Sequence, residues 1–355
     1  MNQVASQGLH LSVDETEAPQ VSATCRVPVS IKRHVQETLQ ELEQLQIITR
    51  VDEPTQWVNR MVVAQKKSGE LRICIDPQTL NKALKRERHP LPILEDILPE
   101  LAQAKVFSKL DLKNGYWHCV LDHESSMLTT FRTPFGRYRW LRLPFGLAAS
   151  SEIFQKRLQT ALDGLQGVVC VADDILVYGT GQNRDVAQLD HDQKLARLLD
   201  RCTEQGIRIN KTKLELNKEE VIFLGHKLTD KGLVIDPDKV KAIREMSPPT
   251  DVGGVLRLCG MVNYIARFLP SISTIMEPIR RLTAKDAKWT WSTEQEEAFE
   301  KVKHLVTTPP ILAFYDEKKA LTIQCDASEK GLGAILLEED SPVSYASRAL
   351  APTEI

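Results

Sequence analysis

The chain contains 355 residues, of which 42% are hydrophobic and 26% charged, an ordinary globular composition with room for two or three domains. Its formal net charge of −2 excludes recognition of nucleic acid through overall positive charge. No run of about 18 apolar residues occurs and the acidic N-terminus lacks the features of a signal peptide, so we expect an intracellular protein, cytoplasmic or nuclear, that does not bind membranes.

The N-terminal region begins without a recognisable element. Residues 1–26 show no hydrophobic periodicity, and we interpret them as a disordered leader. Ser30 then precedes apolar residues at helical spacing over 31–45, which predict a helix capped by Ser30 with one face in the core. This helix carries no candidate chemical group.

A hairpin and a basic segment follow. Residues 58–64 and 71–75 are predicted strands joined by a basic tip that contains Gly69. The segment 82–88 carries four cationic side chains, and a second basic cluster at 132–142 is interleaved with aromatic residues. Charge runs are most often solvated surface, but these two flank acidic motifs, which favours contact with phosphate groups.

A single carboxylate ends the next predicted strand. An apolar run from Val106 finishes at Asp111, and Tyr116 follows shortly after; by its pattern alone, Tyr116 is one more core aromatic. The turn Leu143-Pro144-Phe145-Gly146 then leads into a helix that we expect Ser150 or Ser151 to cap.

Two adjacent carboxylates stand at the centre of the apolar run 168–179. The flanking residues predict two short buried strands with Asp173 and Asp174 at the turn between them. Buried anions are costly and adjacent ones repel, so a bound cation explains the pair better than apolar packing does, and carboxylate oxygens suit Mg²⁺ or Mn²⁺. The alternative is a solvated Asp-Asp turn. A helix over 190–205, with Leu199 among its inward residues, then ends at Gly206.

The last third of the chain alternates short hairpins and helices. Residues 221–226, which include Leu224 and Gly225, could form an ordinary hairpin. Helices are predicted at 238–245, 252–268 and 293–305, with Gly253-Gly254 interrupting the second and weakening it. Three strands are expected at 321–328, 331–338 and 342–347.

The acidic motifs at 111 and 173–174, with Leu143-Pro144-Phe145-Gly146 between them, resemble the reverse transcriptase of gypsy-type LTR retrotransposons from about Val27 to the last residue. The resemblance implies an α+β right-hand polymerase with fingers, a ferredoxin-like palm and a helical thumb, followed by a partial RNase H-like domain. The implied divisions are a leader at 1–26, N-terminal helix and fingers at 27–105, palm at 106–240 with an inserted fingers segment at about 125–142 and the primer grip, thumb at 241–285, and truncated RNase H-like domain at 286–355.

The resemblance also implies roles for individual residues. Asp111, Asp173 and Asp174 would be the catalytic carboxylates and, with the carbonyl of Leu112, would hold two Mg²⁺ ions, or Mn²⁺. Lys67 (or Lys66) and Arg72 would contact the triphosphate, and Lys213 (or Lys211) would lie near the pyrophosphate. Gly115, Tyr116 and Phe145 would surround the nucleotide, with Tyr116 excluding the 2′-hydroxyl. Leu224 and Gly225 would form the turn of the primer-grip hairpin, which holds the primer end. Asp326 takes the place of the first RNase H carboxylate.

The activity implied is RNA-directed DNA polymerisation, with an RNA template, a DNA primer or RNA–DNA hybrid, and deoxynucleoside triphosphates as partners. Val171 stands where the family most often has an aromatic residue. We expect no RNase H activity from this chain, because the family's essential Glu has no match in it. The alternative is a catalytically inactive nucleic-acid-binding relic, which Gly253-Gly254 favours and the intact carboxylates oppose.

Overall fold

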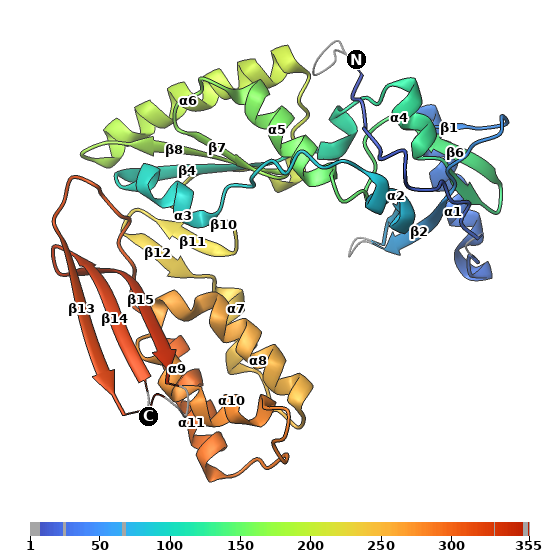
Figure 1. The fold of residues 1–355 in the computed structure, drawn as a ribbon. Coiled ribbons are helices and arrows are strands. Elements are labelled where there is room, and N and C mark those ends of the chain that lie inside the picture. The colour runs from blue at the N-terminus through green and yellow to red at the C-terminus, as the bar shows by residue number, and fades with distance from the viewer. Residues whose placement is uncertain (1–7, 24–25, 66–68, 330, 351–353, 355) are drawn as a thin grey trace. The chain divides into compact units, whose positions relative to one another are not determined.

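The computed structural model describes residues 8–23, 26–65, 69–329, 331–350 and 354. The chain forms two compact units (Figure 1): the first comprises Met1–Pro92, Leu110–Leu176 and Lys194–Leu214, and the second Ile93–Lys109, Val177–Gln193 and Glu215–Ile355. Separate sheets and helices make up both units, so the predicted α+β class is confirmed. Among the described residues, no helix is long and apolar enough to cross a membrane.

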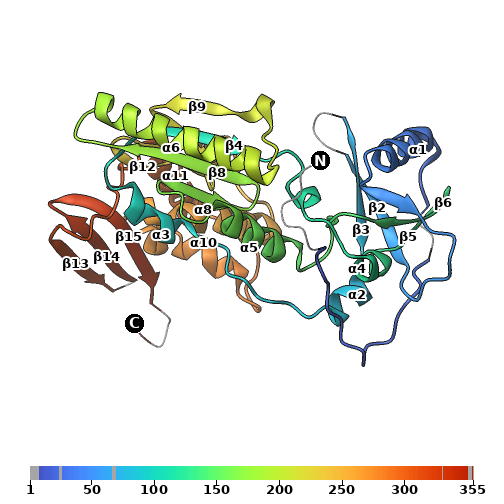
Figure 2. The ribbon, with the colours of Figure 1, turned by 90° about the horizontal axis from the view of Figure 1, so that it is seen from above.

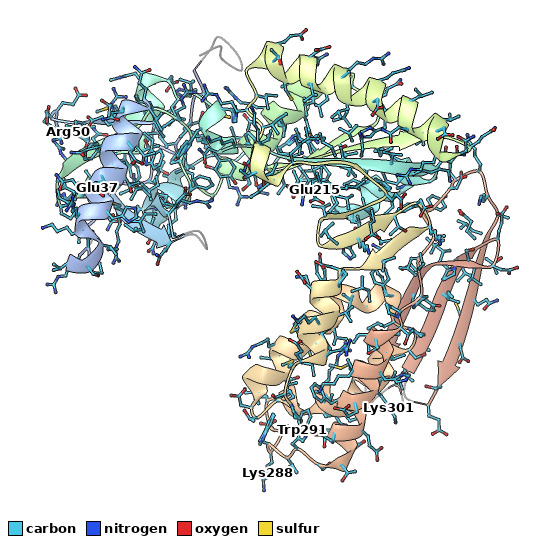
Figure 3. All side chains as sticks on the ribbon, turned by 180° about the vertical axis from the view of Figure 1, so that it is seen from behind. Glu37, Arg50, Glu215, Lys288, Trp291 and Lys301 are labelled. Atoms are coloured by element: carbon cyan, nitrogen blue, oxygen red, sulfur yellow. The ribbon has the colours of Figure 1, made fainter. Side chains whose placement is uncertain are left out.

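A five-stranded sheet organises the first part of unit 1. Its order is β1-β6-β5-β2-β3, and its strands are β1 (Ile48–Arg50), β2 (Asn59–Gln65), β3 (Leu71–Asp76), β5 (Phe131–Thr133) and β6 (Gly136–Trp140). β2 and β3 pair antiparallel, which confirms the predicted hairpin. The aromatic residues of the second basic cluster form the core here, with the Phe131 ring 6.1 Å from Tyr138 and 5.9 Å from Trp140. Arg50 lies over the Tyr138 ring at 5.3 Å (Figure 3).

The arginines of that cluster bind within unit 1. Arg137 donates to the Asp52 carbonyl, Arg139 to the Ser126 hydroxyl and Arg142 to the Trp117 carbonyl. These bonds tie the strands to neighbouring loops, so part of the charge that suggested phosphate contact stabilises the fold.

The α-helices that lie wholly in unit 1 are α1 (Val29–Gln44), α2 (Gln78–Ala83), α4 (His123–Leu128) and α5 (Ser150–Leu162), and the unit has 3-10 turns at Gly115–His118 and Lys211–Lys213. Two predicted caps are wrong. α1 begins after Pro28, so Ser30 lies within it. α5 begins after Ala149 without a side-chain cap, because the Ser150 hydroxyl donates to the Pro144 carbonyl at 2.8 Å.

A second sheet has the order β7-β8-β4-β9. Its strands are β7 (Val168–Val171), β8 (Asp174–Thr180), β4 (Ala104–Asp111) and β9 (Glu215–Lys218). Glu215, the first residue of β9, is labelled in Figure 3. Helix α5 lies against β7 (Figure 2). Helix α6 (Arg184–Gln205) starts before the predicted Asp190, because the Asn183 side chain accepts the Val186 N–H and caps it. Leu199, predicted to point inward, is 42% exposed.

Unit 2 contains the sheet β10-β11-β12 and a set of helices. The elements are β10 (Glu220–Phe223), β11 (His226–Thr229), β12 (Gly232–Ile235), α3 (Leu94–Ile97), α7 (Pro237–Arg244), α8 (Val252–Ile265), α9 (Ile272–Ile275), α10 (Glu277–Arg280) and α11 (Thr293–Thr307), with 3-10 turns at Leu98–Leu101, Ala266–Phe268 and Arg281–Thr283. Phe268 and Phe299 are fully buried among these helices, and Trp291 meets the Phe299 ring edge-on (Figure 3).

The two adjacent glycines of α8 lie in its first turn, and the prediction that they interrupt the helix is wrong. Asp251 caps the helix by accepting the Gly254 N–H at 2.6 Å. A side chain at Gly254 would have its Cβ 3.2 Å from Pro249 Cβ. The prediction used the cost of a glycine in a helix interior, whereas these two lie in the first turn, which the Asp251 cap stabilises.

The three C-terminal strands form a separate antiparallel sheet. They are β13 (Leu321–Ser328), β14 (Gly331–Glu338) and β15 (Ser341–Ala349), which confirms the predicted strands. β13 is exposed along its whole length, with Ile323 69% exposed. Asp326 is therefore a surface residue, and its carboxylate accepts the Ala327 N–H at 2.9 Å.

Candidate active site

The ends of β4 and of the β7–β8 hairpin bring the predicted carboxylates into neighbouring positions in unit 1. Asp111 is the last residue of β4, and the next residue, Leu112, donates its N–H to the Asp173 carbonyl at 2.8 Å. Asp174 begins β8. The backbone pairing therefore joins positions separated by some sixty residues in the sequence, as a convergent acidic site requires.

The hairpin turn is held by Gln155, a residue that the sequence reasoning missed. Ala172 has a left-handed backbone (φ 50°), which a residue with a side chain rarely adopts without support. The fully buried Gln155 side chain accepts the Ala172 N–H and donates to the Cys170 carbonyl, both at 2.8 Å. A polar residue at a buried position of α5, next to Phe154, was the signal available in the sequence.

Asp173 carries an oxygen that is prepared for a cation. Its Oδ1 is buried and has no hydrogen-bond partner within the described part of the chain. Burial raises the pKa of this carboxyl, and the negative charges of Asp111 and Asp174 raise it further, while Arg72 and Lys213 lower it. A buried carboxylate under this repulsion is a favourable ligand for a divalent cation, because the cation removes both penalties.

Asp111 is engaged by cationic and amide groups. Its carboxylate accepts hydrogen bonds from Lys213 Nζ at 2.8 Å and from Asn210 Nδ2 at 3.3 Å, and its side chain is 16% exposed. In the regions that the structure describes, no group of three or more His, Cys, Asp or Glu side chains has its donor atoms already gathered for a metal ion. The donor chemistry fits Mg²⁺, provided that Asp111 exchanges the Lys213 ammonium for the metal ion.

We therefore predict that Lys213→Gln strengthens divalent-cation binding in the absence of nucleotide. Removing a positive charge close to the site should lower the Mn²⁺ dissociation constant about fivefold, measured by Mn²⁺ electron paramagnetic resonance. Lys211→Gln is the matched control, because Lys211 belongs to the same 3-10 turn, Lys211–Lys213. Equal effects of both variants would show that general charge, and not the ion pair with Asp111, sets the affinity.

Gly115 is required by the packing around Asp173. A Cβ at this position would lie 2.2 Å from Asp173 Oδ1 and 2.9 Å from Phe154 Cζ. The residue was predicted to leave room for a nucleotide, and here the space left by its missing side chain is filled by the carboxylate and the Phe154 ring. Any side chain at position 115 must displace the Asp173 carboxylate and the Phe154 ring.

Aromatic rings and one guanidinium lie beside the acidic hairpin. The Tyr116 ring centroid is 4.7 Å from Phe145 and 5.6 Å from Phe154, and its hydroxyl shares a 2.8 Å hydrogen bond with Ser151. The Arg72 guanidinium lies over the Phe145 ring at 4.5 Å. The structure thus brings together three of the residues predicted to bind nucleotide: Arg72, Tyr116 and Phe145.

The turn that carries Phe145 is fixed against β3. Ile75 donates its N–H to the Phe145 carbonyl at 3.2 Å, and Gly146 (φ 112°) passes so close that a Cβ there would overlap the Ile75 carbonyl. Asn81, which the sequence reasoning did not single out, donates to the Gly146 carbonyl at 3.1 Å and accepts the Ala148 N–H at 2.8 Å. Both contacts orient Phe145.

The remaining predicted site residues lie elsewhere. Lys67, with its alternative Lys66, falls outside the described residues. Leu224 and Gly225 form the β10–β11 turn in unit 2, as predicted. Asp326 lies on β13 of the same unit.

Comparison with protein families identifies two segments. Residues 64–228 match the family described as reverse transcriptase (RNA-dependent DNA polymerase), and residues 291–355 match the RNase H-like domain found in reverse transcriptase. The chain is 32% identical over 368 residues to the retrovirus-related Pol polyprotein from transposon 412 of Drosophila melanogaster, covering 100% of this chain and 29% of that protein. It is 28% identical over 297 residues to the transposon Tf2-3 polyprotein of Schizosaccharomyces pombe, covering 82% of this chain and 22% of that one. The chain thus spans less than a third of the length of these relatives.

Solved structures share the fold. A foamy viral protease-reverse transcriptase in complex with RNA/DNA hybrid matches with a TM-score of 0.82 at 22% identity, over 97% of this chain and 46% of that one. A second foamy viral structure, the dRH form in complex with double-stranded DNA, matches with a TM-score of 0.85 at 22% identity, over 100% of this chain and 61% of that one. The predicted polymerase fold is therefore confirmed.

Proposed function

The chain belongs to the reverse transcriptase family, with a reverse transcriptase domain followed by an RNase H-like domain, and from this premise we propose that it catalyses template-directed DNA synthesis on RNA. The observation that carries the proposal is the convergence of Asp111 with the Asp173-Asp174 hairpin, where Asp173 Oδ1 is buried and has no hydrogen-bond partner among the described residues. The partners proposed are an RNA template, a DNA primer and deoxynucleoside triphosphates.

Asp111, Asp173 and Asp174 would hold the divalent cations, together with the Leu112 carbonyl. When bound, such ions lower the pKa of the primer 3′-hydroxyl and neutralise charge on the departing pyrophosphate. The raised pKa of Asp173 means that this carboxyl holds a proton more tightly than a solvated one, so the site is better prepared for a cation as pH rises.

Arg72 and the aromatic group position the nucleotide. The guanidinium lies over Phe145 and can donate two parallel hydrogen bonds to a phosphate. The Tyr116 ring is clamped by Phe145, Phe154 and Ser151, so it presents a rigid surface to the sugar. Lys213, released from Asp111, would lie close to the negative charge of the leaving group.

Primer extension with the purified chain tests the proposal. An RNA template with an annealed DNA primer, deoxynucleoside triphosphates and Mg²⁺ should give extended product, and chelating the Mg²⁺ should stop extension. A parallel reaction on a DNA template measures template preference. Primer–template binding without extension at any Mg²⁺ or Mn²⁺ concentration would instead support the alternative, a catalytically inactive nucleic-acid-binding protein. Gly253-Gly254 no longer favours that alternative, because both glycines fit the first turn of α8.

Gly115→Ala should strongly reduce extension while the protein stays folded. The added Cβ overlaps Asp173 Oδ1 at 2.2 Å, and displacing a reacting group by about 1 Å can cost about 10²-fold in rate. Gly253→Ala is the control, because its Cβ would meet only Asp251 Oδ1, at 3.3 Å. Single-turnover extension rates measure both variants, and a parental rate for Gly115→Ala would mean that the acidic hairpin does not need its present position.

A further inference from the structure

The β10–β11 turn has a backbone that its own sequence does not favour. Phe223 pairs with His226, so Leu224 and Gly225 form a two-residue turn, and both have positive φ angles, 46° and 69°. Such turns prefer Asn or Gly at the first position, and a left-handed leucine costs about 1–2 kcal/mol. Contacts from outside the turn must therefore stabilise it.

Two side chains converge on the Leu224 carbonyl. The Tyr264 hydroxyl, from α8, donates to it at 2.7 Å, and His226 Nδ1 donates to it at 3.0 Å. Since a carbonyl can only accept, the His226 proton is on Nδ1, and burial lowers the pKa of the ring and favours this neutral form. Nε2 is buried without a hydrogen-bond partner among the described residues.

Steric contacts fix the same arrangement. The His226 ring stacks with the Tyr264 ring, at 5.1 Å between centroids, and with the Phe268 ring, at 5.8 Å. A Cβ at Gly225 would lie 2.2 Å from the Tyr264 hydroxyl oxygen, so the turn and the tyrosine fit only while position 225 has no side chain. The turn is thereby joined to helix α8 through both a hydrogen bond and close packing.

The hairpin is also joined to β4, at a residue close to the turn. Lys109 Nζ donates to the Ile222 carbonyl at 3.1 Å, and Lys109 precedes Asp111 by two positions in the same strand. The hairpin is therefore tied to the strand that ends in a candidate catalytic carboxylate and to α8.

We propose that Tyr264 is a positioning residue that locks the Leu224-Gly225 turn to α8 and so fixes where the turn holds the 3′ end of a primer. The proposal rests on the proposed function for the role of the turn. Tyr264 itself acts through the Leu224 carbonyl and need not touch the primer.

Tyr264→Phe removes the hydroxyl and keeps the ring. Amide hydrogen exchange in the segment 220–229 should become about three- to tenfold faster, since a hydrogen bond of ordinary strength is lost. The dissociation constant for primer–template, measured by fluorescence anisotropy without nucleotide, should rise by a similar factor, while the KM for deoxynucleotide stays unchanged. Tyr178→Phe is the matched control. It also removes a tyrosine hydroxyl in unit 2, one that donates a 2.9 Å hydrogen bond to the Glu100 carboxylate.

A double-mutant cycle sharpens the test. Gly225→Ala should weaken primer–template binding less in the Tyr264→Phe background than in the parent, because the overlapping oxygen is gone. Unchanged exchange and unchanged affinity in Tyr264→Phe would overturn the inference. Failure of the parent to extend primers would count against the proposed polymerase activity alone, since exchange and anisotropy do not depend on catalysis.

Discussion

Asp173→Asn should abolish primer extension without unfolding the protein. We expect a loss of about 10³-fold or more in the single-turnover rate, comparable to removing a principal group from a catalytic site. The physical reason is that Asn keeps the shape of Asp but offers no anionic oxygen to a divalent cation.

Whereas the activity of Asp173→Asn should fall, the stability of its metal-free form should be equal to or greater than that of the parent. In the folded protein the pKa of Asp173 is raised above its ordinary value of 3.8, so the unfolded carboxyl ionises first as pH rises. The metal-free protein therefore loses stability as pH increases from about 3.8 through the folded pKa, and at neutral pH the ionised group is a net cost. Asn removes that cost, so the melting temperature of the metal-free variant should equal or exceed that of the parent.

Asp163→Asn provides the comparison for both measurements. Asp163 is an exposed acid that follows α5 in the same unit, so its replacement should alter neither extension nor melting temperature appreciably. Extension by Asp173→Asn at the parental rate would remove the assignment of the acidic hairpin. A large fall in its melting temperature would instead mean that the carboxylate has a structural role, even though its Oδ1 has no hydrogen-bond partner in the described regions of the chain.

Tyr116→Ala should admit ribonucleotides. The ring is held against Phe145 and Phe154. Under the proposed function it would exclude a 2′-hydroxyl, so its removal should leave space for one. Discrimination between deoxy- and ribonucleotides, expressed as the ratio of kcat/KM values, should fall by about 10²-fold, the scale on which a packed pocket rejects an added group.

Tyr116→Phe separates the ring from its hydroxyl. This variant loses only the hydrogen bond to Ser151 and keeps both aromatic contacts, so discrimination should remain within a few-fold of the parent. If the Ala variant discriminates as well as the parent, the ring is not the gate. If both variants lose discrimination, the Ser151 contact orients the ring more than packing against Phe145 does.

The sequence alone was sufficient for several of the strands and for the acidic motifs, and the family resemblance supplied the β10–β11 turn. Alternating or continuous apolar runs predicted β2, β3, β7 and β8. Such runs are informative because the order of apolar and polar residues along a strand depends on whether one or both of its faces are buried. Asp111 and Asp173-Asp174 stood out because carboxylates at the ends of buried strands are costly without a cation. Helix ends were less accurate, since Asn183 and Pro28 determine starts that hydrophobic spacing does not mark.

Only the tertiary structure decided how those groups are held. Gln155 under the hairpin, Lys213 on Asp111 and Tyr264 on the Leu224 carbonyl join residues that are 17, 102 and 40 positions apart. A local pattern reports which side chains are buried. It cannot report which donor meets which acceptor, because that depends on the register and packing of elements distant in sequence. Here those contacts stabilise left-handed backbone at Ala172 and Leu224 and pair the Asp111 carboxylate with an ammonium group.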